Sequence, residues 1–117
     1  MKRYVLVMAY FCGAATLTTN SFSQSDLDMI RSEYERFERA DAELNKVYQE
    51  LSASCDEVRK EKLVKAERAW VAYRDAEASL ESDGPRGGTL ERLTNASVLA
   101  NLTEERVKSL KDTFSSF

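Results

Sequence analysis

The sequence has no histidine at all, and among its 117 residues it has one proline, four glycines and two cysteines. Without histidine, Ser–His and Cys–His nucleophile pairs are excluded and the commonest transition-metal ligand is missing. No nucleophile motif occurs elsewhere in the chain. Two of the 20 acidic residues could in principle act as the acid and base of a glycosidase, but such pairs arise on any acidic helix surface. The sequence therefore predicts a protein that is not an enzyme and that has no cofactor or metal.

The two cysteines cannot build a disulfide framework, because one of them lies in the N-terminal apolar run. Cys12 lies in an N-terminal apolar run, and Cys55 is the one cysteine that follows it. Lipid attachment at Cys12 is disfavoured because the residues before it are bulky. Cys55 can pair two chains or can simply be tolerated, so the domain must be stabilised by packing.

The first 23 residues have the layout of a secretory signal peptide. Lys2 and Arg3 precede an uncharged apolar run over residues 4–17, and a small polar segment ends at Ser23. The run is shorter than the ~20 residues that a membrane-spanning helix needs. We expect cleavage after Ser23, with an uncleaved N-terminal anchor as the alternative.

Residues 24–117 are then expected to form one domain, located in the periplasm or secreted and free of the membrane. This part of the chain has 15 lysines and arginines against 20 aspartates and glutamates, a net charge of −5. Phosphate binding needs clustered positive charge, so nucleic acid is excluded as a partner. An acidic surface suits a cationic protein partner, although such a charge also serves solubility alone.

Heptad spacing predicts three long helices, over residues 25–53, 55–82 and 89–114, with coil from Ser82 to Gly88 around the single proline. The positions of one seam, most of them apolar, recur every three or four residues in each segment. They are Leu27, Ile30, Tyr34, Phe37, Asp41, Leu44, Tyr48 and Leu51, then Leu63, Ala66, Trp70, Tyr73, Glu77 and Leu80, and then Leu93, Ala96, Ala100, Thr103, Val107, Leu110 and Phe114. Ser25 and Ser54 are the expected caps of the first two helices, and a new cap at Thr103 would break the third.

Three amphipathic helices with short connections predict an all-α fold, an up-down-up antiparallel three-helix bundle with coiled-coil-like seams. If the first two helices fold back on each other, their seams face one another. The expected layers pair Phe37 with Tyr73, Asp41 with Trp70, Leu44 with Ala66, and Tyr48 with Leu63.

Asp41 is the one charged residue in the first seam, and a buried carboxylate needs a donor. The Trp70 indole N–H and the Arg74 guanidinium are the candidate donors, at an expected 2.7–3.2 Å. A polar layer of this kind can fix helix register, in which case Asp41→Ala should cost about 1–3 kcal/mol. The alternative is a binding role.

Four ordered motifs resemble the N-terminal domain family of the lysozyme inhibitor LprI. The pattern A-D-x-x-L-N-x-x-Y-x-x-L is matched by Ala40-Asp41, Leu44-Asn45, Tyr48 and Leu51, and A-Q-R-A-W-x-x-Y-R-D by Ala66-Glu67-Arg68-Ala69-Trp70 and Tyr73-Arg74-Asp75. The family's G-G-S loop is similar to Gly87-Gly88-Thr89, and its T-x-x-R-x-x-x-L ending to Thr103, Arg106 and Leu110. The resemblance covers about Met29 to Leu110.

The resemblance implies an exported binding protein that blocks lysozyme, a commonly basic enzyme that suits an acidic partner. The motif positions it marks as binding residues are Asp41, Asn45, Tyr48, Trp70, Tyr73, Arg74, Asp75 and Arg106. The alternative function is a structural or assembly module of the bacterial cell envelope, which an apolar stripe left exposed would favour. The residues do not fix the partner or the oligomeric state.

The resemblance also implies a lost disulfide framework. Three cysteine positions of the family correspond to Ser32, Ala78 and Val98 in this chain. If the alignment holds, the Cβ atoms of at least two of them should lie about 4–5 Å apart.

Overall fold

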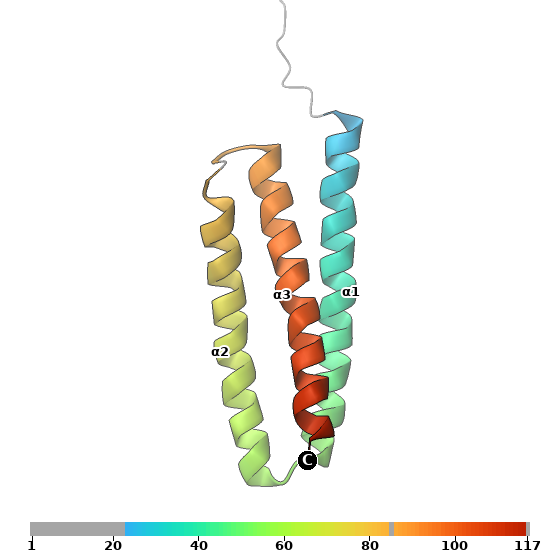
Figure 1. Cartoon of the computed structure of the whole chain (residues 1–117), viewed down its shortest axis with the longest axis vertical. Helices are drawn as coiled ribbons and strands as arrows, with labels where there is room; N and C mark the ends of the chain where they lie inside the picture. The colour runs from blue at the N-terminus through green and yellow to red at the C-terminus, as the bar shows by residue number, and fades with distance from the viewer. Residues whose placement is uncertain (1–22, 85, 117) are drawn as a thin grey trace, which may run out of the picture.

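The computed structural model describes residues 23–84 and 86–116. Residues 1–22 of the expected signal peptide and the single proline lie outside them. The described residues form three helices and no strand: α1 (Gln24–Ser54), α2 (Glu57–Ser82) and α3 (Thr89–Ser115) (Figure 1). The predicted all-α, up-down-up bundle is confirmed, and each helix bound falls within two residues of the expected one. No helix in the described ranges is long and apolar enough to cross a membrane.

The helix caps differ from the predicted ones. The Ser23 hydroxyl accepts a hydrogen bond from the Asp26 backbone N–H at 3.1 Å, so α1 begins two residues earlier than a Ser25 cap would allow. The carboxylate of Asp56, not Ser54, caps α2 by accepting from the Arg59 N–H at 2.8 Å. Carboxylates and hydroxyls are both good caps, so the choice between neighbours follows from where the chain turns.

Helix α3 runs without a break through Thr103. Thr103 is fully buried, and its hydroxyl donates to the Leu99 backbone carbonyl at 2.7 Å. This hydrogen bond lies within α3, so Thr103 does not cap a new helix. At the start of the helix, Gly87 adopts a φ of +73°, and its backbone N–H donates to the Glu91 carboxylate. Only glycine takes that conformation without strain.

Helix α3 lies between the other two and packs against both, while α1 and α2 make little contact with each other (Figure 1). Helices α1 and α2, whose seams are expected to lie opposite one another, therefore pack mainly against α3. Ala96 and Ala100 on α3 are completely inaccessible to solvent. Small residues at these positions let neighbouring helices approach closely, and this explains why α3 takes the central place.

The apolar core lies in the half of the bundle that holds the α1–α2 connection. Its buried members are Leu44, Val47, Leu63, Val107 and Leu110, with Tyr48, Leu51, Trp70 and Phe114 packed against them. Tyr48 thus packs on the same cluster as Leu63, in agreement with the expected layer.

The buried face of α2 is not the predicted one beyond Leu63. Its buried residues are Leu63, Arg74, Ala78 and Ser82, whereas the predicted seam members Ala66, Tyr73 and Leu80 are exposed. The expected pairs Phe37–Tyr73 and Leu44–Ala66 are therefore wrong. Helix α2 has a second face with a similar spacing, which includes Arg74 and Ser82, and the bundle buries that face.

Candidate functional site

Arg74 is a nearly buried charged residue in the middle of the bundle. Its side chain is 11% exposed, and its guanidinium carbon lies 5.2 Å from the ring centroids of both Phe37 on α1 and Trp70 on the preceding turn of α2. A guanidinium over an aromatic face is attracted to the ring, and more strongly when water is excluded. Arg74 therefore joins α1 to α2 in a region where the two helices otherwise make little contact.

The carboxylate partners of Arg74 are Asp75 and Asp41. The Nε and Nη2 atoms lie 2.8 Å from the Asp75 Oδ1, and Nη1 lies 3.5 Å from the Asp41 Oδ1. Arg74, not Trp70, is therefore the donor to Asp41, but the distance is longer than the expected 2.7–3.2 Å. Asp41 is also 43% exposed, so the prediction of a buried carboxylate is wrong.

We accordingly expect Asp41→Ala to lower the free energy of unfolding by less than about 1 kcal/mol, below the 1–3 kcal/mol that burial would imply. A long ion pair to a carboxylate that water also reaches contributes little, and Arg74 keeps Asp75 as its main partner. Urea denaturation of the variant and of Asp41→Asn measures this, and the two should agree within about 0.5 kcal/mol. A loss above about 2 kcal/mol for alanine would restore the buried-layer interpretation.

Arg106 and Glu67 form the best-shielded ion pair among the described residues. The Arg106 Nε and Nη2 atoms donate to the Glu67 Oε2 at 3.1 and 3.0 Å, and the two side chains are 17% and 15% exposed. The Arg106 guanidinium carbon also lies 5.7 Å from the Trp70 ring centroid. Trp70 therefore contacts Arg74 on its own helix and Arg106 on α3. Because Arg74 also contacts Phe37 on α1, these contacts connect all three helices.

The remaining predicted site residues lie around this layer. Tyr48 is half-buried against the apolar core, while Asn45, Tyr73 and Asp75 are exposed. The structure thus brings together Asp41, Trp70, Arg74, Asp75 and Arg106, and it leaves Asn45 and Tyr73 facing solvent. No buried side-chain nitrogen or oxygen within the described ranges lacks a hydrogen-bond partner, so this layer is internally satisfied.

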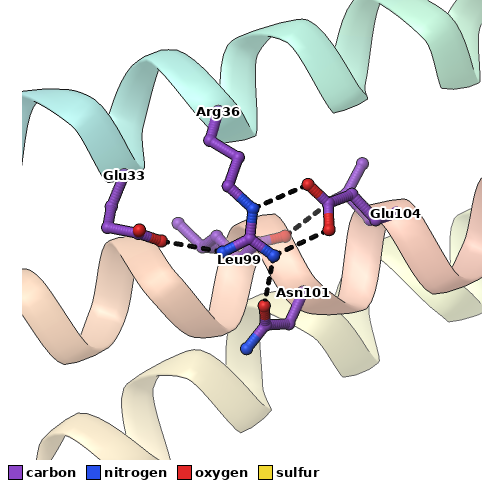
Figure 2. Close-up of polar contacts among 6 residues, drawn as sticks. Glu33, Arg36, Leu99, Asn101 and Glu104 are labelled. Atoms are coloured by element: carbon purple, nitrogen blue, oxygen red, sulfur yellow. Dashed lines mark hydrogen bonds and ion pairs between the residues drawn. The ribbon is translucent and has the colours of Figure 1, made fainter.

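Arg36 forms a second polar centre that the sequence did not reveal (Figure 2). Its Nε and Nη2 atoms each lie 2.7 Å from a Glu104 carboxylate oxygen, Nη1 lies 3.0 Å from Glu33, and Nη2 lies 2.5 Å from the Asn101 Oδ1. This bidentate ion pair between Arg36 and Glu104 joins α1 to α3 and fixes the orientation of both side chains. The spacing of Glu33 and Arg36 was visible in the sequence, but the partners on α3 are 65 and 68 residues away.

The ion pairs between α1 and α3 shift the titration of their members. Hydrogen bonding to Arg36 holds the pKa of Glu104 below its usual range, and the same contact raises the pKa of Arg36. Toward the C-terminal end of these helices, the hydrogen bond from Lys111 at 2.8 Å lowers the pKa of Glu43. Both carboxylates are therefore more strongly ionised in the folded than in the unfolded protein.

The stability should consequently fall as the pH drops below the unfolded carboxylate value of about 4.3. The sign follows from the depressed pKa of Glu104: its contribution is present above that value and is lost as the pH falls through its folded pKa. In thermal unfolding from pH 7 to pH 3, Glu104→Gln should unfold at a lower temperature than the wild type at pH 7. The gap should close in acid, and a gap that stays constant would contradict the assignment.

The net charge of the domain is concentrated at one end. Residues 23–41 and 72–101 form what we call the acidic half, which contains the start of α1, the end of α2 and the start of α3 (Figure 1). It has 11 aspartates and glutamates against six lysines and arginines, a net charge of −5. Residues 42–71 and 102–116, the neutral half, have nine of each sign. The antiparallel fold therefore places the whole net charge of the described chain in one half.

An open cleft lies in the acidic half, where all three helices contribute to its walls. It has a volume of about 520 Å³ and is lined by Met29, Ser32, Glu33, Glu81, Leu93, Thr94, Ser97, Val98 and Asn101. Met29 is 47% exposed, and Glu81 is exposed with no hydrogen bond or ion pair to the described residues. The cleft thus offers an apolar wall beside carboxylates. No group of acidic or cysteine side chains in the described part of the chain is placed to hold a metal ion.

Comparison with known proteins fits the motifs described above. The family model described as lysozyme inhibitor LprI matches residues 18–110. The chain belongs to the LprI lysozyme inhibitor family. An uncharacterized protein of Rhizobium meliloti (strain 1021) is 35% identical over 103 residues, which cover 77% of this chain and 73% of that relative. No solved structure matches the chain.

The three positions expected to correspond to family cysteines lie in the half of the bundle that holds the cleft. Ser32 and Val98 both line it, and Ala78 is buried on the face of α2 that packs in the bundle. Their expected Cβ separation stays a prediction. Arg36, which ties α1 to α3 one turn from Ser32, provides a crosslink between helices that does not depend on cysteine.

Proposed function

We propose that this chain is an exported, non-enzymatic binding protein of the periplasm or the secreted fraction that inhibits a cationic lysozyme, and that it docks through its acidic half. The observation that carries the proposal is the concentration of the whole net charge of −5 in the half that contains the open cleft. A field of one sign beside a concave surface attracts and orients a partner of the opposite sign. Membership of the LprI family supports the class of partner.

The acidic half has carboxylates that are free to meet a partner. Glu35, Glu38 and Glu81 are exposed, and none of their carboxylates has a hydrogen bond or ion pair with another described side chain. Several neighbours are already occupied: Asp28 pairs with Arg31, and Asp83 pairs with Arg86. The unpaired three therefore carry most of the attraction that a cationic surface would experience.

The cleft has the chemistry to receive a lysine or arginine side chain of the partner. Met29 and Leu93 can cover the aliphatic stem, while Glu81 can bind the charged end beside Glu33, which is itself paired with Arg36. The layer of Trp70, Arg74 and Arg106 has a supporting role in this proposal, because it fixes the three helices whose ends form the cleft. Among the other motif positions, Asp41 and Asp75 hold Arg74, and Tyr48 packs on the core.

The experiment measures inhibition of a strongly basic lysozyme, followed as the clearing of a bacterial cell-wall suspension. Reversing three charges in the acidic half, with Glu35→Lys, Glu38→Lys and Glu81→Lys, should weaken inhibition at least about tenfold, because the partner then meets a cationic surface. The matched control reverses Glu50, Glu61 and Asp112, which are exposed in the neutral half and change the net charge by the same amount.

The control variant should lose no more than about threefold, through the change in net charge alone. Equal losses in both variants would show that docking does not use the acidic half. Failure of the unmodified protein to slow lysis at any concentration would refute lysozyme as the partner. Circular dichroism must show that both variants keep the helical content of the wild type.

A structural or assembly role is the second candidate function, and one observation favours it. The bundle leaves large apolar side chains exposed on α2, including Tyr73 and Leu80 at 51% and 69% exposure. Exposed apolar residues that share one helix face indicate a contact surface.

A further inference from the structure

Helix α2 has an apolar face that the bundle does not cover, and we call it the outer stripe. It consists of Ala66, Ala69, Tyr73, Ala76 and Leu80, all of which are exposed. Their spacings of three, four, three and four place them on one side of the helix, over about 21 Å at 1.5 Å per residue. This is the pattern of a helix–helix seam, yet no helix in the described part of the chain occupies it.

The outer stripe is separate from the face with which α2 enters the bundle. The buried residues Arg74, Ala78 and Ser82 follow the same repeat one or two positions later, which turns them by roughly 100° or more around the helix. Next to Tyr73, a shallow depression of about 220 Å³ reaches across to Leu102 and Arg106 on α3. On α3 this depression is lined by Leu102 and by the polar residues Glu105, Arg106 and Ser109, so the outer stripe is bordered by polar side chains on this side.

The charges beside the outer stripe change sign along α2. Lys62 and Lys65 lie at its N-terminal end, and Glu81 and the C-cap residue Asp83 lie at its C-terminal end, all four exposed. Glu81 also borders the cleft, and Asp83 also pairs with Arg86. A cationic protein would be repelled at the first end and an anionic one at the second. A second α2 placed antiparallel meets the opposite sign at both ends, whereas a parallel one meets like charges.

We propose that two copies of this chain associate through their outer stripes, with the two α2 helices antiparallel and a two-fold axis near Tyr73. That axis sets Leu80 of one copy near Ala66 of the other, and Ala76 near Ala69. Lys62 and Lys65 then lie near Asp83 and Glu81 of the second copy. Such an interface is isologous, so it closes at two copies. The alanines let the helices approach closely, and Tyr73 and Leu80 supply the apolar area.

This proposal is tested separately from lysozyme binding through Tyr73 and Leu80, which do not line the cleft, whereas Glu81 belongs to both proposals. The first experiment is sedimentation equilibrium of the protein recovered from the periplasm of an expressing bacterium. The wild type should be a dimer at micromolar concentration. Tyr73→Asp and Leu80→Asp should each raise the dissociation constant roughly tenfold or more, since both bury a charge in the seam.

The control is Leu90→Asp, which places the same charge at an exposed leucine of α3 and should leave the dimer unchanged. Both stripe residues face solvent within one copy, so these variants should keep the helical content of the wild type. A wild type that is monomeric at 100 µM, or a dimer equally sensitive to Leu90→Asp, would overturn the proposal.

The orientation is tested by disulfide trapping in a Cys55→Ser background, which removes the one cysteine of the described residues. In the antiparallel dimer, Ala69→Cys and Ala76→Cys proteins should crosslink to each other when mixed, and each alone should crosslink at least about fivefold less. A parallel pair would give the reverse, because each position would then face its own copy. Efficient self-crosslinking of both single variants would therefore refute the antiparallel arrangement.

A charge exchange gives a further check. Lys62→Glu with Lys65→Glu should weaken the dimer, and adding Glu81→Lys with Asp83→Lys should restore it, since opposite signs again meet across the interface. Lys46→Glu with Lys108→Glu, both exposed and on α1 and α3, changes the net charge by the same amount and is the control. Failure of the second pair to restore association would contradict the proposed register.

Discussion

Replacing Arg74 with alanine is expected to lower the free energy of unfolding by about 3 kcal/mol. The guanidinium contacts the rings of both Phe37 and Trp70, and the side chain is only 11% exposed. Alanine removes the buried stem and both ring contacts, and it leaves a void between α1 and α2. Chemical denaturation monitored by Trp70 fluorescence and by circular dichroism measures the change.

Two further substitutions separate packing from charge at this position. Arg74→Met keeps an apolar stem, and because Asp41 and Asp75 are 43% and 57% exposed, losing their cation should cost little. We therefore expect methionine to recover about half of the loss. Arg68→Ala, an exposed position on the same helix, should change stability by less than about 0.5 kcal/mol. If Arg74→Ala costs no more than Arg68→Ala, Arg74 does not hold the bundle.

Enlarging Ala100 to leucine should also cost about 3 kcal/mol, by the opposite mechanism. Ala96 and Ala100 are both 0% exposed on the central helix, where there is no room for three more carbon atoms. Leucine at position 100 must push α3 away from its neighbours or take a strained rotamer. The helix propensities of alanine and leucine are close, so the loss reports packing.

Ala42→Leu on the exposed side of α1 is the matched control and should leave the free energy of unfolding within about 0.5 kcal/mol of the wild type. Thermal or urea denaturation of the two variants gives the comparison directly. If Ala100→Leu proves as stable as Ala42→Leu, the close approach of α3 to the other helices is not what defines the bundle.

The sequence by itself determined the secondary structure, the order of the helices and the family. Heptad spacing and one Gly- and Pro-containing connection are local signals, and they placed the ends of all three helices within two residues. The motif residues also included both arginines that contact Trp70. The choice between Trp70 and Arg74 as the donor to Asp41 stayed open, because it depends on a distance between two helices.

Only the tertiary structure decided which face of α2 is buried. Ala66, Tyr73 and Leu80 have the same spacing as a core seam, so periodicity cannot tell them from the face that holds Arg74 and Ala78. The decision comes from α3, whose small residues let it pack between the other two helices. The partners of Arg36 are likewise set by how α1 and α3 pack.

The net charge of −5 follows from composition, but its location does not. The acidic segments 23–41 and 72–101 are separated by 30 residues in the sequence, and they meet because the chain reverses direction twice. A charge pattern read along one chain gives a sum, whereas a binding surface depends on which segments lie side by side. The acidic half and its cleft exist only in the folded bundle for that reason.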